Sequence, residues 1–379
     1  MNKIKRKLNN FWQPGKDEHE ADKVLVFIIM IILVIGLAAL SSATSVLAFK
    51  RFGDSYHYFN QQLFALGVAL FFFFIFSKIN YTFWKKYAIF FLFASCLILL
   101  LVFIPGIGAD YDKAQRWINL FGISIQPSEF VKVFFLIYLA AWVERRKDDL
   151  GFASSGIIPF LFVLAVITIL MYMQPDMGTL SIVILSSLVV FFVGGGRILH
   201  LFVVGIIGCL VLFGAYYSMP YVQNRFQCFV DPQIDTRDVC YQINQSMIAV
   251  GSGGLWGQGI GQSKQKFMYL PEVTADSIFP IMAEELGFVW SSLLIFLYFA
   301  LFYRGIMIAK NASDKFGQLL AVGIVSWIML QAFLNIGGMI NIIPMTGVPL
   351  PLISYGGSAM VSTLIALGIL VNISKYTTE

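Results

Sequence analysis

Apolar residues along this chain gather in ten long blocks, which are separated by shorter polar segments. The hydrocarbon core of a bilayer is about 30 Å thick, and a helix needs about 20 apolar residues to cross it. The pattern therefore predicts an all-α polytopic membrane protein with ten transmembrane helices. Several blocks are short for a full crossing, so thinning of the bilayer or flanking loop residues must complete them. The predicted spans are 24–48, 62–77, 87–104, 129–143, 156–173, 179–195, 198–217, 277–303, 318–340 and 357–374.

The composition agrees with a membrane protein and excludes a soluble one. Of the 379 residues, 58% are hydrophobic and only 12% are charged, whereas a soluble domain carries about 25% charged residues. The first apolar block is too long for a cleavable signal peptide, so it is interpreted as the first spanning helix. The net charge of +5 reflects orientation in the membrane rather than binding of nucleic acid, because Lys and Arg collect in cytoplasmic loops.

The distribution of positive charges predicts which segments are cytoplasmic. With a cytoplasmic N-terminus, the inner segments carry 17 Lys and Arg residues and the outer segments carry eight. Both termini are therefore expected inside. The chain then divides into a cytoplasmic segment at 1–23, a single membrane domain at 24–374 and a cytoplasmic tail at 375–379. The two longest polar segments, 105–128 and 218–276, lie outside, the second as a large loop between spans seven and eight.

Two charged residues at the head of the fourth predicted span, Glu129 and Lys132, are candidates for function because ionisable groups inside a bilayer are costly. Their spacing of three places them on one helix face, where they can form an ion pair. A structural clasp between helices and a direct role in substrate binding are equally favoured. Arg116, in the preceding outer loop, can hold phosphate oxygens in its planar fork, and its alternative is a solvated loop residue.

Acidic residues also lie where the large outer loop meets the eighth span. Asp276 sits at the start of this span, where an acidic residue commonly caps a helix, and capping alone would explain it. Glu284 and Glu285 follow about two turns deeper, where an unpaired carboxylate is costly. They need cationic partners, and the candidates on the outer side are Lys132 and Arg116. The choice between these pairs stays open.

Irregular segments rich in Pro and Gly supply further candidates. Asp176 lies in the tight turn between spans five and six and is expected to cap the next helix, so a structural role is favoured. The segment 344–358 holds three prolines and repeated glycines, which at membrane depth are tolerated only where backbone is buried in protein or lines a wet cavity. Its Ser354 and Tyr355 are candidates for substrate binding. Another Gly-rich stretch, 251–261, lacks the Lys-Ser/Thr ending of a phosphate loop and is interpreted as a flexible loop.

Two of the four cysteines, Cys228 and Cys240, are predicted to form a disulfide. Both fall in the large outer loop, on a side of the membrane that is oxidising in many bacteria. The polar segment between them contains Pro232 and can fold back, while chance proximity in sequence is the alternative. Cys96 and Cys209 lie in apolar spans and are expected to stay reduced. The four cysteines show no spacing typical of a zinc site.

Together these motifs resemble the SEDS family (shape, elongation, division and sporulation proteins), which includes FtsW and RodA. Each motif is weak alone, but they occur together and in the order of the family. The segment 45–54 is more similar to the division branch than to the elongation branch. The matching pieces are Arg116-Trp117, Gln126-Pro-Ser-Glu-Phe-Val-Lys132, Gln174-Pro-Asp-Met-Gly-Thr179, Gly251-Ser-Gly-Gly254, Leu270-Pro-Glu followed by Asp276, Ala283-Glu-Glu-Leu-Gly287 and Pro349-Leu-Pro-Leu-Ile-Ser-Tyr-Gly-Gly-Ser358.

The resemblance implies a peptidoglycan glycosyltransferase in the bacterial cytoplasmic (inner) membrane. Such an enzyme polymerises lipid II, the undecaprenyl-pyrophosphate-linked disaccharide peptide, on the outer face during cell division. The implied partners are a class B penicillin-binding protein transpeptidase and other divisome proteins. The essential aspartate of the family falls on Asp276. Two departures, Lys113-Ala-Gln-Arg-Trp for Gly-Ala-Arg-Arg-Trp and Thr274-Ala-Asp for His-Thr-Asp, keep this aspartate and one arginine.

The expected reaction is a single in-line displacement, because the donor sugar is α-linked and the new bond is β. Asp276 is the expected base for the acceptor 4-hydroxyl. Arg116, Lys132 or a divalent cation (Mg²⁺ or Mn²⁺) would stabilise the departing pyrophosphate, and the metal requirement stays open.

Three other functions are alternatives. A lipid II flippase needs polar groups across the whole depth of the bilayer, whereas the candidate residues cluster in its outer half, which favours the polymerase. An elongation-type polymerase similar to RodA is the alternative within the family. A non-catalytic scaffold would not require so many buried charges.

Overall fold

The computed structural model describes residues 19–106, 108–111, 114–120 and 123–377. Most of the predicted cytoplasmic segment (1–18), Lys113 and the last two residues of the predicted tail lie outside the described residues.

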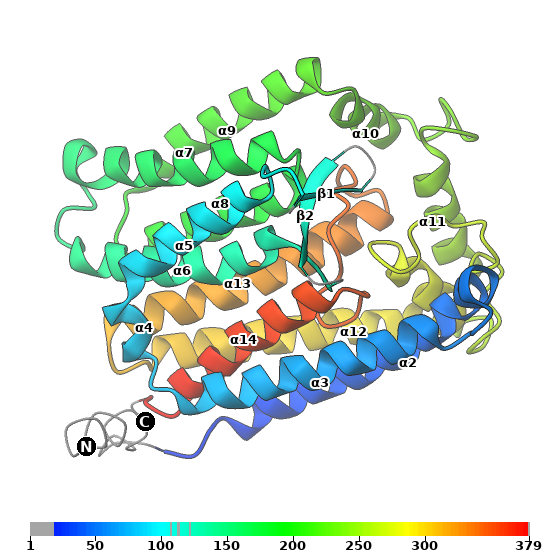
Figure 1. Cartoon of the computed structure of the whole chain (residues 1–379), viewed down its shortest axis with the longest axis horizontal. Helices are drawn as coiled ribbons and strands as arrows, with labels where there is room; N and C mark the ends of the chain where they lie inside the picture. The colour runs from blue at the N-terminus through cyan, green and yellow to red at the C-terminus, as the bar shows by residue number, and fades with distance from the viewer. Residues whose placement is uncertain (1–18, 107, 112–113, 121–122, 378–379) are drawn as a thin grey trace.

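Most of the described chain is helical, and the long helices pack side by side into one bundle (Figure 1). In chain order the elements are α2 (Lys23–Phe52), α3 (His57–Lys78), α4 (Thr82–Lys86), α5 (Ala88–Leu101), β1 (Gly108–Tyr111), β2 (Ala114–Leu120), β3 (Ile123–Ile125), α6 (Pro127–Arg145), η1 (Ala153–Ile157), α7 (Ile158–Met173), α8 (Met177–Val193), α9 (Ile198–Ser218), α10 (Pro220–Val230), α11 (Tyr241–Ser252), α12 (Ile278–Lys310), α13 (Lys315–Met339) and α14 (Gly357–Ser374).

A helix lies at each of the ten predicted apolar blocks. Within the described residues, seven helices are long and apolar enough to cross a membrane, namely α2, α3, α7 with η1, α9, α12, α13 and α14. The apolar helices α5 and α8 are shorter, with 14 and 17 residues. The fold is therefore that of a helical, multi-pass membrane protein.

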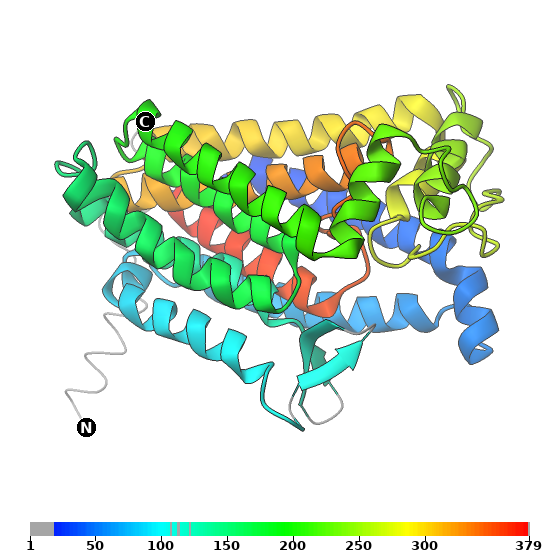
Figure 2. The same ribbon diagram turned by 90° about the horizontal axis from the view of Figure 1, so that it is seen from above.

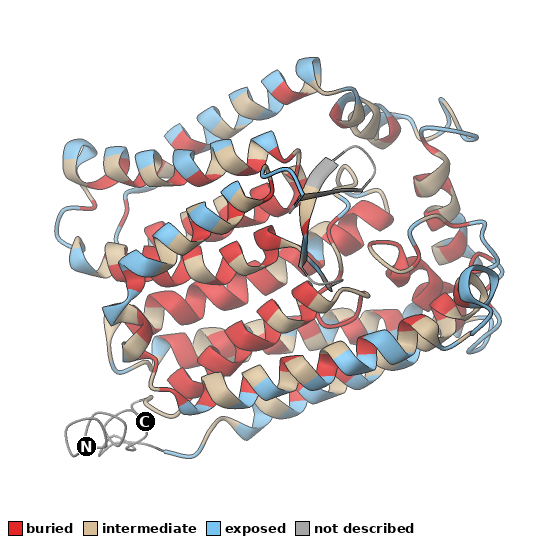
Figure 3. Cartoon of the chain, viewed as in Figure 1, coloured by how far each residue is buried: buried red, intermediate tan, exposed pale blue. Residues whose placement is uncertain are grey.

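Burial divides the bundle into a centre and a rim. In α13 and α14 the apolar stretch is 78% and 83% buried, whereas in α9 it is only 17% buried. Figure 3 shows the same division, with buried residues concentrated on the central helices and exposed ones along the outer edges. Large side chains such as Trp327, Phe316 and Tyr298 fill the centre. The apolar residues that α9 exposes suit contact with lipid, because a bilayer imposes no cost on them.

The segment 105–128 contains a small antiparallel sheet of order β1-β2-β3, so the expectation of an all-α chain was wrong at this point. The strands have four, seven and three residues. Such short strands carry too little alternation to be seen in the pattern of apolar residues. Figure 1 shows the sheet beside the ends of α5, α6 and α8 that lie away from the start of α2 and the end of α14.

The Gly-rich stretch 251–261 is bound to α12 and is not the flexible loop that was expected. The amide of Gln258 donates to the carbonyl of Glu284 (2.9 Å), and the amide of Phe288 donates to the carbonyl of Gly254 (2.9 Å). At Gly287 the helix is interrupted by a residue with φ 79°. A Cβ there would lie 2.2 Å from the amide nitrogen of Gly257, so only glycine permits this close approach of two backbones.

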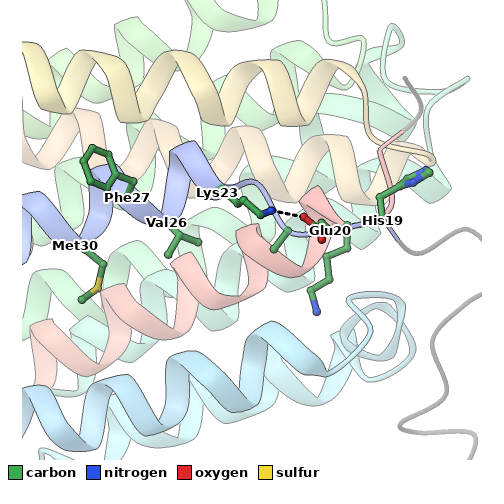
Figure 4. Close-up of a pocket in the computed structure, with 8 residues that line it drawn as sticks. His19, Glu20, Lys23, Val26, Phe27 and Met30 are labelled. Atoms are coloured by element: carbon green, nitrogen blue, oxygen red, sulfur yellow. Dashed lines mark ion pairs between the residues drawn. The ribbon is translucent and has the colours of Figure 1, made fainter.

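The start of α2 and the end of α14 lie together at the opposite end of the bundle (Figure 1). Figure 2 shows α11 gathered with its neighbouring loops at the far end of the long helices. The amide of Asp22 donates to Oγ of Ser374 (3.1 Å), and its carboxylate pairs with Arg304 (2.5 Å). A hollow of about 880 Å³ at this end is bordered by the exposed ion pair of Lys23 and Glu20 (Figure 4). None of the candidate functional residues lines it.

Candidate active site

The candidate residues come from elements that meet at the end of the bundle that carries the sheet, α10 and α11 (Figure 1). Asp276 is buried one residue before the N-cap of α12. Gln242 Nε2 donates to Asp276 Oδ1 (3.1 Å), and Ser277 Oγ donates to the same oxygen (3.3 Å). Asn335 Nδ2 donates to the Asp276 carbonyl (2.8 Å). The N-cap of α12 is Ser277 and it has no side-chain cap bond, so capping does not explain Asp276.

Arg225 on α10 is the cation whose charge acts on Asp276, and no motif in the sequence marks it. Burial raises the pKa of Asp276 to about 6, which the charge of Arg225 opposes and that of Glu272 reinforces. Burial lowers the pKa of Arg225, and the charge of Asp276 opposes this change. Arg225 Nη1 also donates to the Thr346 carbonyl (2.8 Å), and its guanidinium lies over the ring of Tyr221 at 5.3 Å. In sequence Arg225 is one of several charges in a polar segment, and only the fold distinguishes it.

A cavity of about 260 Å³ opens beside this cluster. Gln242, which donates to Asp276 from α11, and Arg225 on α10, whose charge acts on Asp276, both line it. Its other polar groups are amides and a phenol, which suit the hydroxyl and amide groups of an amino sugar. The remaining lining residues are Tyr221, Asn224, Cys228, Phe229, Val239, Ile243, Asn341 and Met345.

Arg116 on β2 lies against the turn that carries Asp176. Its Nε and Nη2 donate to the carbonyls of Gln174 (3.2 Å) and Pro175 (2.6 Å). Asp176 caps α8 by accepting from the amide of Thr179 (3.3 Å), as its place in the turn predicted. The charges of Arg116 and Asp176 both act on Arg225, so the turn lies close to the Asp276 cluster.

Glu129 and Lys132 form an ion pair of 2.9 Å in the interior of the bundle. Lys132 Nζ also donates to Gln331 Oε1 on α13 (2.8 Å), and Ser362 Oγ on α14 donates to Glu129 Oε2 (3.2 Å). Both charged side chains are only 1% exposed. The pair thus joins α6 to α13 and α14, an environment that favours the structural clasp over direct contact with substrate.

Glu284 and Glu285 are bound by residues that lie far from them in sequence or in the outer loop. Lys266 pairs with Glu285 (3.0 Å), and Ser42 Oγ donates to the same carboxylate (2.7 Å). Glu284 accepts from the hydroxyl of Ser263 and from loop amides. The expectation that Lys132 or Arg116 would pair with them was wrong, because the outer loop folds back and brings Lys266 onto α12. These carboxylates fasten the loop to the helix.

Ser354 and Tyr355 lie in the irregular segment before α14. Ser354 Oγ accepts from the amide of Leu350 (2.8 Å) and thereby stabilises its own turn. The amide of Tyr355 donates to the Thr274 carbonyl (2.9 Å), two residues before Asp276. Its hydroxyl donates to Gln61, and its ring packs edge-on against Tyr58 at 5.2 Å. Tyr355 therefore connects α3 to the loop that carries Asp276.

The structure joins Cys228 to Cys240 as a disulfide and leaves Cys96 and Cys209 as free thiols, in agreement with the sequence analysis. No group of three or more His, Cys, Asp or Glu suited to a metal occurs among the described residues. Around Asp276 the neighbours are an arginine, an amide and a hydroxyl, and among the described residues Glu272 is the one carboxylate whose charge is seen to act on it. This donor set does not fit a resident Mg²⁺ or Mn²⁺, which prefers several oxygen ligands.

Comparison with known proteins places these features in one family. The model of the FtsW/RodA/SpoVE family, described as "Cell cycle protein", matches residues 22–379. "Stage V sporulation protein E" of Bacillus subtilis is 38% identical over 356 residues, 94% of this chain and 97% of the relative. "Probable peptidoglycan glycosyltransferase FtsW" of Trichlorobacter lovleyi is 35% identical over 355 residues, 94% of this chain and 93% of the relative. A chain from the structure described as "Structural coordination of polymerization and crosslinking by a peptidoglycan synthase complex" is 26% identical with a TM-score of 0.77, covering 93% and 97% of the two chains.

Proposed function

We propose that this chain, which belongs to the FtsW/RodA/SpoVE family of cell cycle proteins, is a peptidoglycan glycosyltransferase that polymerises lipid II in cell division. The protein is a multi-pass protein of the bacterial inner membrane. The observation that carries the proposal is the buried carboxylate of Asp276, held by Gln242 and faced by Arg225 beside a polar cavity. Two relatives that align over more than 90% of this chain and of their own length are named "Probable peptidoglycan glycosyltransferase FtsW".

The topology that suits this function has ten spans, formed by α2, α3, α5 to α9 and α12 to α14. Both termini are then cytoplasmic, which agrees with the excess of Lys and Arg in the inner segments. The domain at 24–374 contains all of the spans, between the cytoplasmic segments 1–23 and 375–379. The segment 218–276, with α10, α11 and the disulfide, lies outside. Lipid II, whose isoprenoid tail stays in the bilayer, would then meet Asp276 at the outer surface.

Asp276 acts as the general base in this mechanism. Its carboxylate takes the proton from the acceptor 4-hydroxyl while that oxygen attacks the anomeric carbon of the donor and the bond to pyrophosphate breaks. With a pKa of about 6, roughly nine-tenths of the group is ionised at pH 7. A base whose pKa lies near the working pH is both available and strong enough to accept the proton.

The departing undecaprenyl pyrophosphate needs positive charge, and the site offers Arg116 and Arg225. The charges of Arg116 and Asp176 both act on Arg225, and we infer that the two guanidinium groups lie near enough to serve one diphosphate. An arginine fork binds two phosphate oxygens at once, which suits this leaving group. Glu129 and Lys132 stabilise the helices below the site by joining α6 to α13 and α14. Tyr355 stabilises the Asp276 loop through its bond to the Thr274 carbonyl.

The partners we propose are a class B penicillin-binding protein and other divisome proteins. The solved complex that contains the structural relative is described as coordinating polymerization and crosslinking. A polymerase of this family would hand uncrosslinked glycan to a transpeptidase. The division role rests on the FtsW names of the relatives.

The test is to incubate the purified protein with labelled lipid II, with and without a cognate penicillin-binding protein, and to compare Asp276→Asn with the wild type. We expect the Asn variant to lose about 10²-fold to 10⁴-fold in rate, the range of a lost general base, while remaining folded. Asp238→Asn, an exposed carboxylate of the same outer segment, is the matched control and should retain full activity. Wild-type polymer yield from the Asp276 variant would exclude Asp276 as the base.

A further inference from the structure

The disulfide joins α10, which carries the Arg225 charge that acts on Asp276, to the start of α11, which carries the Gln242 amide that donates to Asp276. Arg225 lies on α10, three residues before Cys228, so the two side chains share one helix face. Gln242 lies in the first turn of α11, two residues after Cys240. Cys228, Arg225 and Gln242 line the same cavity. The cross-link therefore sits within one helical turn both of the guanidinium whose charge acts on the base and of the amide that bonds to it.

Apart from the disulfide, α10 is held to other described segments by a few weak contacts, which include the bond from Arg225 to the Thr346 carbonyl (2.8 Å) and the packing of Phe226 against Tyr216 at 6.0 Å. Cys228, Cys240 and Ile243 form a small hydrophobic cluster that is separate from the main core. The carbonyl of Phe229 accepts from Asn341 Nδ2 (3.3 Å), and the hydroxyl of Tyr221 donates to the Pro175 carbonyl (3.4 Å). The preceding helix, α9, is the least buried of the candidate spans. Figure 1 shows α10 continuing from the end of α9 at the edge of the bundle.

We propose that the Cys228–Cys240 disulfide is a positioning element of the catalytic centre, which fixes α10 to α11 and so keeps Arg225 and Gln242 against Asp276. The inference rests on the proposed function, because it assigns a role to Arg225 and Gln242 in the same reaction. Its physical basis is that a cross-link excludes arrangements in which the two helices separate. The hydrogen bonds that join α10 to other segments through Tyr221, Arg225 and Phe229 are each worth only about 1 kcal/mol and would not exclude them.

Loss of the cross-link has two separable consequences. A displacement of about 1 Å in a positioned group can cost on the order of 10²-fold in rate, so polymerisation slows. The charged groups that face Asp276 are Arg225 from α10 and Glu272 from its own loop, whereas α11 and α13 contribute the neutral Gln242 and Asn335. When Arg225 moves away, burial and Glu272 act unopposed, and Asp276 takes up its proton at a higher pH.

The experiment uses the full chain with its two free thiols removed, as Cys96→Ser and Cys209→Ser, so that the disulfide is the single redox group. Dithiothreitol supplies two electrons and two protons, leaving two thiols and becoming a cyclic disulfide itself. Rates of lipid II polymerisation are then measured against pH in the oxidised and the reduced protein. We expect reduction to lower kcat/KM by about tenfold to a hundredfold and to move the acidic limb of the profile to higher pH. Reoxidation should restore both.

Cys228→Ser with Cys240→Ser is the matched variant, and it should reproduce the reduced profile while being insensitive to dithiothreitol. An unchanged rate and an unchanged acidic limb after reduction would overturn the proposal. A lower rate and lower melting temperature with an unmoved acidic limb would also overturn it, since the bond would then be only a structural staple.

Amide hydrogen exchange gives a measurement that does not depend on activity. Reduction should speed exchange in peptides from 220–230 more than in peptides from 315–339, the buried α13. Equal protection of 220–230 in both redox states would show that the bond does not hold α10. If the oxidised protein makes no polymer, the proposed function fails, and the exchange data still decide whether α10 is fixed by the bond.

Discussion

Replacing Lys132 by Met should destabilise the protein by about 3–5 kcal/mol, the cost of leaving one member of a buried ion pair without its partner. Lys132 Nζ lies 2.9 Å from Glu129 and 2.8 Å from Gln331, and 4.7 Å above the ring of Trp327. After the change, Ser362 is the one side chain among the described residues that still donates to Glu129. Gln331 Oε1 keeps the indole N–H of Trp327 as a donor, so most of the loss belongs to the carboxylate.

The double variant Glu129→Gln with Lys132→Met separates a coupled pair from two independent residues. Two independent losses would sum to roughly 6–10 kcal/mol. A coupled pair loses much less in the double variant, because no buried charge remains and a neutral replacement of both partners is often tolerated. We therefore expect the double variant to be more stable than either single one.

The assay is thermal or denaturant unfolding in detergent, with activity measured in parallel. The control is Lys85→Met, which breaks the partly exposed pair of Lys85 and Glu144 (2.7 Å) and should cost no more than about 1 kcal/mol. Additive losses in the Glu129 and Lys132 variants would refute the clasp. A Lys132 variant that keeps wild-type stability but loses polymerisation would show that Lys132 acts in substrate binding instead.

Three further predictions follow from the outer end of the bundle. Because the pKa of Asp276 is raised to about 6, kcat/KM should fall as pH drops through that value. Stability depends on pH in the opposite direction to activity. The contribution of Asp276 to the free energy of unfolding is fully present below the ordinary pKa of 3.8 and is lost as pH rises through about 6. Lys266→Met should speed proteolysis of the loop, whereas Lys266→Met with Glu285→Gln should restore part of its protection. Gly287→Ala should lower the melting temperature, because a Cβ would lie 2.2 Å from the Gly257 nitrogen. The control is Gly251→Ala, where nothing lies within 4 Å of the added Cβ, and this variant should melt as the wild type.

The parts of the fold that the sequence predicted are those set by local physics. Each apolar block became a helix because a run of about 20 apolar residues can satisfy its backbone in a bilayer only in this way. Asp176 was expected to cap a helix because the cap is decided within three residues, and it does so. The pairing of Cys228 with Cys240 depended on a short segment that closes on itself, and the structure contains it.

The parts that could not be predicted depend on segments distant in sequence. Lys266 meets Glu285 because the outer loop folds back onto α12, and no spacing rule relates the two. Arg225 looks like any other charge of a polar loop until α10 is placed against the Asp276 loop. The strands β1 to β3 are too short to leave a periodic signal.

The position of the base is determined from both sides of the α12 start. On the helix side, Glu284 and Glu285 bind the loop of Ser263 and Lys266, and the glycines at 257 and 287 allow the two backbones to touch. On the other side, the Thr274 carbonyl accepts from Tyr355 and the Asp276 carbonyl accepts from Asn335. A general base is effective only when it is held in place before the substrate arrives. The glycines and carboxylates near Asp276 therefore serve to make one carboxylate rigid, while Gln242 on α11 donates to it and the charge of Arg225 on α10 opposes the rise of its pKa.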